Sequence, residues 1–191
     1  MSFQVDGTSF LEPFVVDVDL DNGAMPNATN HLVRRASDMR GYYQDEKALE
    51  ALIADGDPLH YEVFEVPVPE EYGHLMYCIS KLQPGRVGDE FFMTKGHYHT
   101  VLQTGEIYLG LRGEGYMVMK TPDGVFNAQP IARGKMVYVP PYWAHRSVNA
   151  SDEPLVSFCV YPGDAGHNYG DIVEQGFPKG VFFEDGTVVV K

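Results

Sequence analysis

From residue 61 onward, hydrophobic and polar residues alternate in short runs that turn-forming residues separate. Alternation with a period of two is typical of β-strands that bury one face. The intervening segments, such as QPGRVG, RGEG and NASDEP, are rich in residues that favour turns. Many short strands at near-regular spacing favour an all-β barrel or sandwich over alternating βαβ units. The predicted strands cover residues 61–66, 75–82, 91–94, 98–101, 106–111, 116–121, 125–131, 136–139, 145–148 and 155–161.

The residues that flank these strands predict fewer elements. A strand is expected over 14–20, and a helix over 44–54, where the apolar residues of KALEALIA recur at helical spacing and Gly56 follows. The last apolar run, 181–190, predicts a hairpin that pairs with the arm or with a sheet edge. We therefore expect one domain over residues 1–191, made of an N-terminal arm and helix (1–57), a barrel core (58–165) and a C-terminal extension (166–191).

Composition and charge limit the partners and the location. The 191 residues are enough for one hydrophobic core, and the 44% hydrophobic content is that of a globular protein. The formal net charge of −13 repels polyanions, so we expect neither nucleic acid nor an anionic membrane as a partner. No run approaches the ~20 apolar residues of a membrane span, and the N-terminus lacks the basic start and apolar core of a secretion signal. We expect a cytoplasmic protein.

The two cysteines favour a structural role. Cys78 and Cys159 lie within apolar, strand-like runs and show no CxxC spacing. A buried free thiol behaves as a small hydrophobic residue, and a cytoplasmic location disfavours a disulfide. We expect two buried free thiols.

Four residues have side chains that bind divalent transition metals: His97, His99, Glu106 and His145. His97 and His99 share one face of an extended strand because side chains alternate, and Tyr98 points the other way. The residues between His99 and Glu106 are enough for a loop and the start of the next strand to return past the histidines. Three imidazoles and one carboxylate suit one Fe(II), Mn(II), Ni(II) or Zn(II) ion per chain, with positions left open for a substrate.

Glycine and proline frame these residues. The second piece follows the pattern G-x5-P-x4-H-x3-N, in which the chain leaves one strand through a Pro-Pro corner before His145. Together with the run GHYHTVLQTGE, this pattern resembles the paired motifs of the cupin superfamily. The resemblance implies an all-β cupin fold (a double-stranded β-helix, or jelly-roll barrel), here with an N-terminal arm and one or two short helices.

Four further segments, RRASDMRGYYQDE, EFFMTKGHYH, YVPPYWAHR and YPGDAGHNYG, are similar to the cupin-type glucose-6-phosphate isomerases, and the similarity runs from about residue 14 to about residue 185. The resemblance implies interconversion of glucose 6-phosphate and fructose 6-phosphate by a homodimer. Among the four metals, we favour Fe(II) or Mn(II). It also implies that Tyr161 and His167 line the sugar end of the site. The residues that it assigns to the phosphate pocket are Tyr61, Ser80, Thr94, Gly96 and Tyr142.

Two chemical routes are open for such an isomerisation. Glu106 is the natural base for proton transfer through a cis-enediol, which we favour, although a metal-bound carboxylate is a weak base. The alternative is a direct hydride shift between C1 and C2. Three other functions also remain open: an Fe(II) cupin dioxygenase, a non-catalytic sugar-binding cupin, and an isomerase of different specificity, such as one that uses mannose 6-phosphate.

Overall fold

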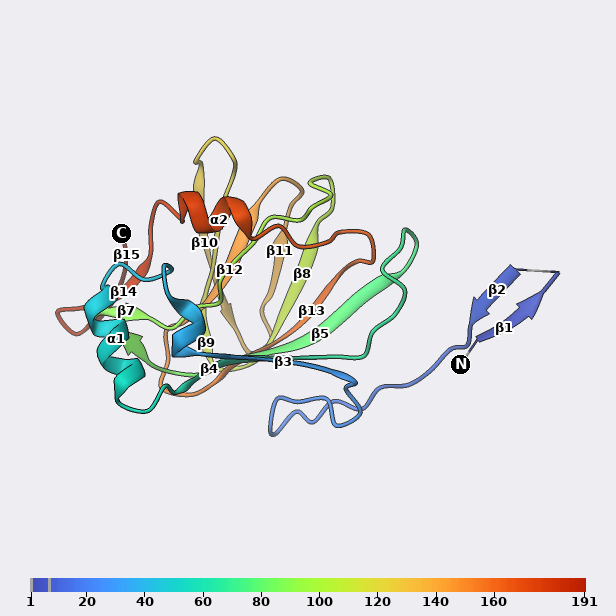
Figure 1. Ribbon diagram of the computed structural model, residues 1–191, viewed down its shortest axis with the longest axis horizontal. Helices are drawn as coiled ribbons and strands as arrows, with labels where there is room; N and C mark the ends of the chain where they lie inside the picture. The colour runs from blue at the N-terminus through green and yellow to red at the C-terminus, as the bar shows by residue number, and fades with distance from the viewer. Residues whose placement is uncertain (1, 7) are drawn as a thin grey trace.

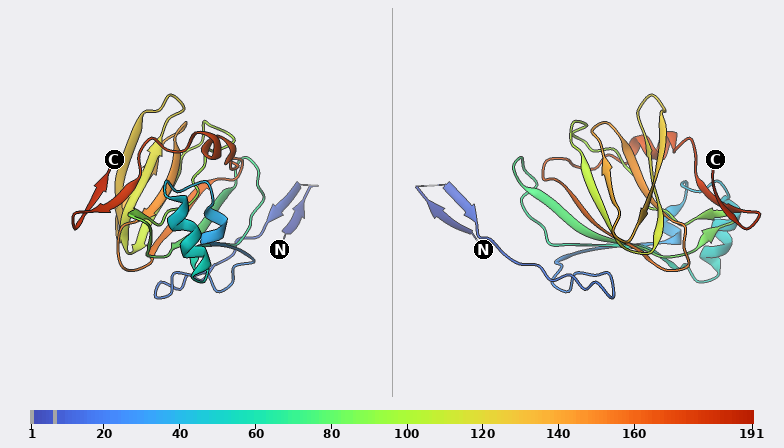
Figure 2. Two further views of the ribbon diagram at one scale, coloured as in Figure 1. Left: turned by 60° about the vertical axis from the view of Figure 1, so that its left-hand side comes forward. Right: turned by 180° about the vertical axis from the view of Figure 1, so that it is seen from behind.

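The computed structural model describes residues 2–6 and 8–191 (Figure 1). Two antiparallel sheets form the body of the molecule and face each other (Figure 2). The larger sheet has the strand order β11-β8-β13-β5-β4-β3, which are Met136–Val139, Glu106–Arg112, Leu155–Pro162, Leu75–Leu82, Leu59–Glu65 and Asn30–Arg35. The smaller has the order β10-β9-β12, which are Phe126–Ala132, Glu114–Lys120 and Ala144–Asn149. The expectation of an all-β, jelly-roll type of barrel is confirmed.

A third sheet closes one end of the barrel. Its order is β15-β14-β7-β6, which are Thr187–Val190, Val181–Glu184, Glu90–Phe91 and Arg86–Val87. The predicted C-terminal hairpin is confirmed as β14 and β15, and it joins a sheet edge through the pairing of Phe182 with Glu90. A separate hairpin of β1 (Ser2–Val5) and β2 (Thr8–Leu11) lies away from the barrel in every view (Figures 1 and 2). Met1 and Gly7 of the predicted arm are outside the described residues.

Strand alternation places the core between the two main sheets. On β5, Cys78, Ser80 and Leu82 point inward, and Ile79 points to the outer face, where Met25 of the N-terminal segment covers it. The inner cluster includes the fully buried Met117 of β9, which shows why the alternating pattern of the sequence predicts the barrel.

The helices are few and short. The predicted helix is confirmed as α1 (Glu46–Ala54), and Asp45 caps it because its carboxylate accepts a hydrogen bond from the Ala48 amide at 2.9 Å. The chain also forms η1 (Ala36–Met39) and α2 (Gly170–Gln175), which lies over the barrel opening (Figure 1).

Several predicted strands are corrected. The strand expected over 14–20 is wrong: no strand pairs with this segment, and Val15 is 83% exposed. The strand expected over 98–101 is also wrong, because that segment makes only one isolated bridge, at Tyr98, next to the bridge at His97. The strand expected over 91–94 is shortened to β7 plus a single bridge at Met93. Conversely, β1, β2, β3 and β6 lie outside the predicted strands, and β6 falls within QPGRVG, a predicted turn segment.

Candidate metal centre and active site

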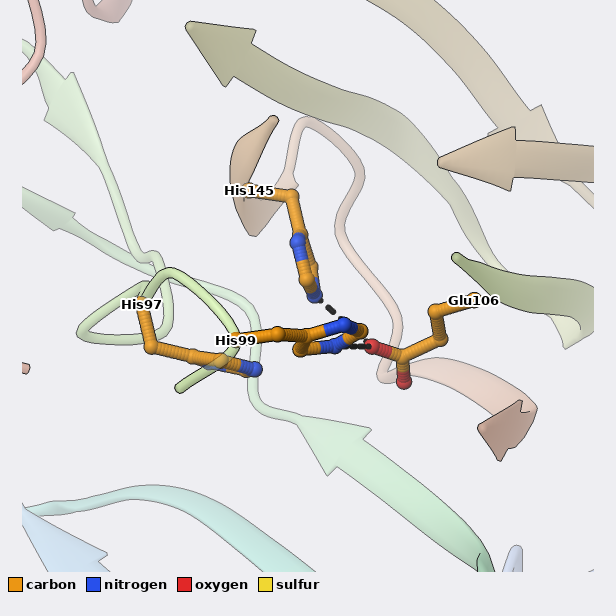
Figure 3. Close-up of side chains that lie close together, drawn as sticks. All are labelled: His97, His99, Glu106 and His145. Carbon is orange, nitrogen blue, oxygen red and sulfur yellow. Dashed lines mark hydrogen bonds and ion pairs between the residues drawn. The ribbon is translucent and has the colours of Figure 1, made fainter. Parts of the chain in front are cut away.

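The four predicted metal ligands converge inside the barrel. The potential ligand atoms of His97, His99, Glu106 and His145 all lie within 4.8 Å of one another (Figure 3). Glu106 is the first residue of β8, and His145 lies near the start of β12. The backbones of His97 and His145 exchange two hydrogen bonds, of 3.2 and 3.1 Å, which fix the extended segment of residues 97–99 against β12. Tyr98 points away into a separate cluster with Ala144, as the alternation predicts.

The burial and contacts of these side chains fit a cation. His99, Glu106 and His145 are only 4%, 3% and 1% exposed. Oε2 of Glu106 lies 2.8 Å from Nε2 of His145 and 3.1 Å from Nε2 of His99. Nε2 of His97 is buried and has no hydrogen-bond partner among the described residues. A buried polar atom without a partner is costly, and a cation at this position would satisfy it. The nitrogen and oxygen donors therefore fit a divalent transition metal.

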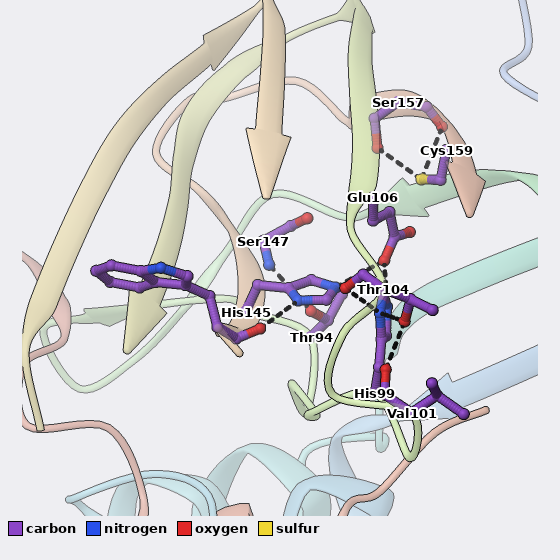
Figure 4. Close-up of polar contacts among 10 residues, drawn as sticks. Thr94, His99, Val101, Thr104, Glu106, His145, Ser147, Ser157 and Cys159 are labelled. Carbon is purple, nitrogen blue, oxygen red and sulfur yellow. Dashed lines mark hydrogen bonds and ion pairs between the residues drawn. The ribbon is translucent and has the colours of Figure 1, made fainter. Parts of the chain in front are cut away.

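Hydrogen bonds to the second ring nitrogen orient two of the histidines (Figure 4). Nδ1 of His99 donates to Oγ1 of Thr104 at 2.8 Å and lies 3.2 Å from the Thr104 carbonyl oxygen. The Thr104 hydroxyl in turn donates to the carbonyl of Val101 at 2.7 Å. Nδ1 of His145 lies 3.4 Å from the carbonyl oxygen of Trp143. With a metal bound in place of the Nε2 proton, these contacts would hold the ring proton on Nδ1 and leave Nε2 of each ring as the ligand atom.

The electrostatics favour the ionisation states that bind a metal. Burial raises the pKa of Glu106, but the attraction and hydrogen bond of His145 and the hydrogen bond of His99 outweigh it, so the pKa lies well below its ordinary value. Burial lowers the pKa of His97, and the neighbouring His145 lowers it further. An ionised carboxylate beside a neutral imidazole gives the charge and the lone pairs that a divalent cation needs.

A cavity of about 520 Å³ opens beside the ligand cluster. Its size suits a small organic ligand. Two of the metal ligands, His97 and Glu106, reach its wall. The wall also contains most of the other residues that the sequence assigns to the site, namely Tyr61, Ser80, Thr94, Gly96, Tyr161 and His167.

Tyr142 is the one predicted substrate-binding residue that does not line this cavity among the described residues; of the four candidate ligands, His99 and His145 also lie behind its wall. It lies at the Pro-Pro corner with a φ of 71°, its backbone amide donates to the carbonyl of Leu102 at 2.7 Å, and its side chain is 48% exposed. The backbone at this corner is left-handed, and the Tyr142 side chain lies outside the cavity that the other predicted phosphate-pocket residues line.

Tyr161 and His167 lie together on the wall. The Tyr161 hydroxyl donates to Oε1 of Glu65 at 3.3 Å, and burial raises the pKa of Tyr161, so this phenol stays protonated. The His167 ring lies 4.5 Å from the His97 ring between centroids, and it stacks on Tyr169 at 6.0 Å. A protonated phenol and an accessible imidazole next to the ligand cluster can donate and accept protons at a bound substrate.

The structure adds wall residues that the sequence does not predict. Arg34 and Glu65 lie at opposite ends of the β3–β4 pair, and Tyr108 of β8 lies two residues after Glu106. Strand alternation is the signal for all three. Arg34 faces Tyr61 across the sheet, Glu65 lies four residues after Tyr61 on the same strand, and Tyr108 shares the inner face with Glu106.

Both cysteines are buried and free, as predicted. Cys78 of β5 and Cys159 of β13 face each other directly in the sheet register, and both reach the cavity wall. Burial raises the pKa of Cys159, which keeps the thiol protonated and poorly reactive. No helix within residues 2–6 and 8–191 is long and apolar enough to cross a membrane.

Comparisons with known proteins place this site in a family. The model of the glucose-6-phosphate isomerase family matches residues 33–191. The glucose-6-phosphate isomerase of Thermococcus litoralis is 47% identical over 182 residues, which cover 95% of each chain. That of Pyrococcus furiosus is 48% identical over 181 residues, with the same coverage. A putative glucose-6-phosphate isomerase 2 of Rhizobium meliloti is 40% identical and covers 93% of this chain and 89% of its own.

Similarity to solved structures is lower. One structure of an oxalate oxidase is 14% identical, covers 61% of this chain and 58% of its own, and gives a TM-score of 0.49. The assignment therefore rests on the family model and on relatives that match nearly the whole chain. The chain belongs to the glucose-6-phosphate isomerase family.

Proposed function

We propose that this chain is a metal-dependent isomerase that interconverts glucose 6-phosphate and fructose 6-phosphate. The observation that carries the proposal is the convergence of three histidines and one glutamate beside a ligand-sized cavity, with His97 and Glu106 at its wall. Membership of the family supports the substrate pair. The hydroxyl groups of Tyr61, Ser80 and Thr94 on the same wall suit a phosphate, whose oxygens accept hydrogen bonds.

His97, His99, Glu106 and His145 would hold the metal, and we propose Fe(II) or Mn(II) because the donors are nitrogen and oxygen with no thiolate. When bound, such an ion supplies Lewis acidity for the carbonyl and hydroxyl oxygens of a sugar. The protein positions this chemistry through Thr104, which fixes the orientation of the His99 ring.

Glu106 carries the proton in the proposed route. Both of its contacts with histidine are made through Oε2, so we assign Oε1 as the atom that takes a proton from C2 of the open-chain aldose. Loss of that proton gives a cis-enediolate with its charge on O1; transfer of the hydroxyl proton from O2 to O1 and return of the carbon-bound proton to C1 give the ketose. The low pKa of Glu106 makes it a weak base, but it holds the proton only until the neighbouring carbon receives it.

His167 and Tyr161 complete the assignment of roles. His167 is accessible at the cavity wall, and burial lowers its pKa, so the imidazole stays neutral and can accept a proton; we assign it to opening of the sugar ring. Tyr161 stays protonated and can donate a hydrogen bond to a sugar hydroxyl. Thr94 presents its hydroxyl at the phosphate end, where Oγ1 already accepts a hydrogen bond from the Ser147 amide at 3.1 Å.

A coupled assay with added metals tests the proposal. Protein that a chelator has stripped, with metal content verified, should not convert fructose 6-phosphate, and Mn(II) or Fe(II) should restore the rate. Full activity in verified metal-free protein would refute the metal role. No conversion with Fe(II), Mn(II), Ni(II) or Zn(II) would refute the proposed reaction. Mannose 6-phosphate in parallel measures specificity.

The proton route and the assembly have their own tests. Reaction in D₂O should place deuterium on the carbon that receives the proton, and complete retention of the substrate hydrogen would favour a hydride shift.

We also propose a homodimer, since apolar side chains such as Phe14, Val15 and Leu20 are 50%, 83% and 64% exposed in the N-terminal segment. Sedimentation equilibrium measures the oligomeric state directly.

A further inference from the structure

Two cations lie at one end of the cavity without an acidic partner. Arg34 of β3 and Lys95, which precedes Gly96, both line the wall. Among the described residues neither of them forms an ion pair with a carboxylate. Two neighbouring cations at the wall of a partly enclosed cavity favour a bound anion.

The position of Arg34 follows from the register of the sheet. Asn30, Leu32 and Arg34 alternate onto the inner face of β3, and Arg34 stands directly opposite Tyr61 on β4. The next residue, Arg35, lies on the other face, where its guanidinium donates to the carbonyl of Asp57 at 2.9 Å. The inner arginine is therefore aimed at the hydroxyl groups that the phosphate would contact.

Most of the hydrogen-bond donors of the Arg34 guanidinium have no partner among the described residues. Its Nε is buried and has no hydrogen-bond partner among the described residues. Its one hydrogen bond in the structure runs from Nη1 to the carbonyl of Val33, at 3.2 Å. A guanidinium offers five donors in a planar fork that matches the oxygens of a phosphate. The free donors and the neighbouring hydroxyl of Tyr61 together form a partial phosphate site.

The opposite end of the cavity carries the opposite charge. Glu65 and Glu70 line the wall there, and Oε2 of Glu65 accepts a hydrogen bond from Asn30 at 2.8 Å. Asn30 and Arg34 are four steps apart along β3, about 13 Å in an extended strand. A ligand with one anionic end and a polar, uncharged body matches this distribution of charge.

We infer that Arg34 is the residue that recognises the phosphate group of the substrate, with Lys95 as a second cation beside it. The inference rests on the proposed function and deepens it by naming the residue that distinguishes a sugar phosphate from a free sugar. Charge-assisted hydrogen bonds from a partly buried guanidinium account for about a 10- to 100-fold difference in affinity.

Substitution of two adjacent arginines tests the inference. Arg34→Gln and Arg35→Gln remove the same charge from neighbouring positions on opposite faces of β3, so Arg35→Gln is a matched control. Two quantities are measured on the metal-loaded protein: the Kd of inorganic phosphate by calorimetry, and KM and kcat for fructose 6-phosphate. Metal content is measured for every variant. Arg34→Lys keeps the charge but loses the planar fork.

We expect Arg34→Gln to raise both the Kd of phosphate and KM about 10- to 100-fold. Its kcat should stay within about threefold of the parent value, since phosphate is bound in the ground state and the transition state alike. Arg35→Gln should match the parent, and Arg34→Lys should fall between the two. A KM and a Kd for Arg34→Gln within twofold of those for Arg35→Gln would overturn the inference.

The outcomes separate this inference from the proposed function. A parent protein that binds phosphate through Arg34 but converts no sugar phosphate would refute the proposed function and leave the anion site standing. A parent that isomerises fructose 6-phosphate with a KM unaffected by Arg34→Gln would support the function and remove Arg34 from recognition. If the parent does not bind inorganic phosphate measurably, the KM comparison alone decides.

Discussion

The Thr104 hydroxyl lies 2.8 Å from Nδ1 of His99 and determines which nitrogen of that ring faces the site. The hydroxyl accepts a hydrogen bond from the ring N–H and donates one to the carbonyl of Val101. It therefore holds the ring and the loop of residues 99–104 together. The orientation of a candidate metal ligand thus depends on a residue outside the ligand set.

We predict that Thr104→Val weakens metal affinity about tenfold, at the low end of the range for loss of such a partner, because the Thr104 carbonyl remains 3.2 Å from the same nitrogen. Competition with a chelator of known affinity measures the change. Thr104→Ser should restore the affinity, and Thr100→Val, on an exposed residue of the same loop, should leave it unchanged. Parent-like affinity of Thr104→Val would contradict the role.

Glu106→Gln should lower kcat by about 10²- to 10⁴-fold, the usual contribution of a general base. The amide keeps the shape of the side chain but cannot take the proton. Metal content must be measured in parallel, because the substitution also removes a charged ligand. Glu114→Gln, on the exposed start of β9, is the control. A near-normal rate at full metal loading would exclude Glu106 as the base.

The stability of the protein should depend on pH through His60. This residue is fully buried, Tyr43 donates a hydrogen bond to its Nε2 at 2.6 Å, and burial lowers its pKa to about 3. Below pH 6.5 the unfolded chain binds a proton that the folded chain does not. The free energy of unfolding should therefore fall by about 1.4 kcal/mol per pH unit from 6.5 toward 3, and the full contribution is present above 6.5.

Urea unfolding at pH 7, 6 and 5 measures this dependence. His60→Gln keeps a partner for Tyr43 but does not titrate, so its free energy of unfolding should fall less steeply than that of the parent. His31→Gln, at an exposed position, should follow the parent. Equal slopes for the parent and His60→Gln would show that His60 is not the titrating group.

Gly115→Ala should destabilise the barrel by about 3 kcal/mol or more, through overpacking. A Cβ at this position of β9 would lie 2.0 Å from the carbonyl oxygen of Val148 on β12, and a backbone atom cannot move aside cheaply. Gly170→Ala is the control, since its Cβ would meet only the side chain of Asn168 at 3.5 Å. Thermal unfolding measures both, and equal midpoints would contradict the predicted clash.

The convergence of the four candidate ligands is predictable because each lies in a short segment whose orientation is set locally. The alternation around His97 and His99, and the corner before His145, specify orientation without long-range information. The turn segments that contain glycine and proline likewise predict where most of the strands begin and end. These local signals are sufficient to anticipate that the ligand atoms meet in the barrel.

The remaining features depend on the tertiary arrangement. β3 is a short edge strand whose alternation in NHLVRR is weak, so neither the strand nor the inward orientation of Arg34 is evident without its partner β4. The segment 14–20 has strand-like composition, but no neighbouring strand pairs with it. The direction of Tyr142 depends on a φ of 71° that composition does not reveal.

The opposite charges at the two ends of the cavity have a consequence for larger anions. A hexose that carries a second phosphate on C1 would bring that group toward the carboxylates of Glu65 and Glu70 when its first phosphate faces Arg34. Like charges at contact distance in a partly buried site disfavour that complex. A sugar bisphosphate should thus compete poorly with the monophosphates, so the cavity can stay available to its substrates when bisphosphates are abundant.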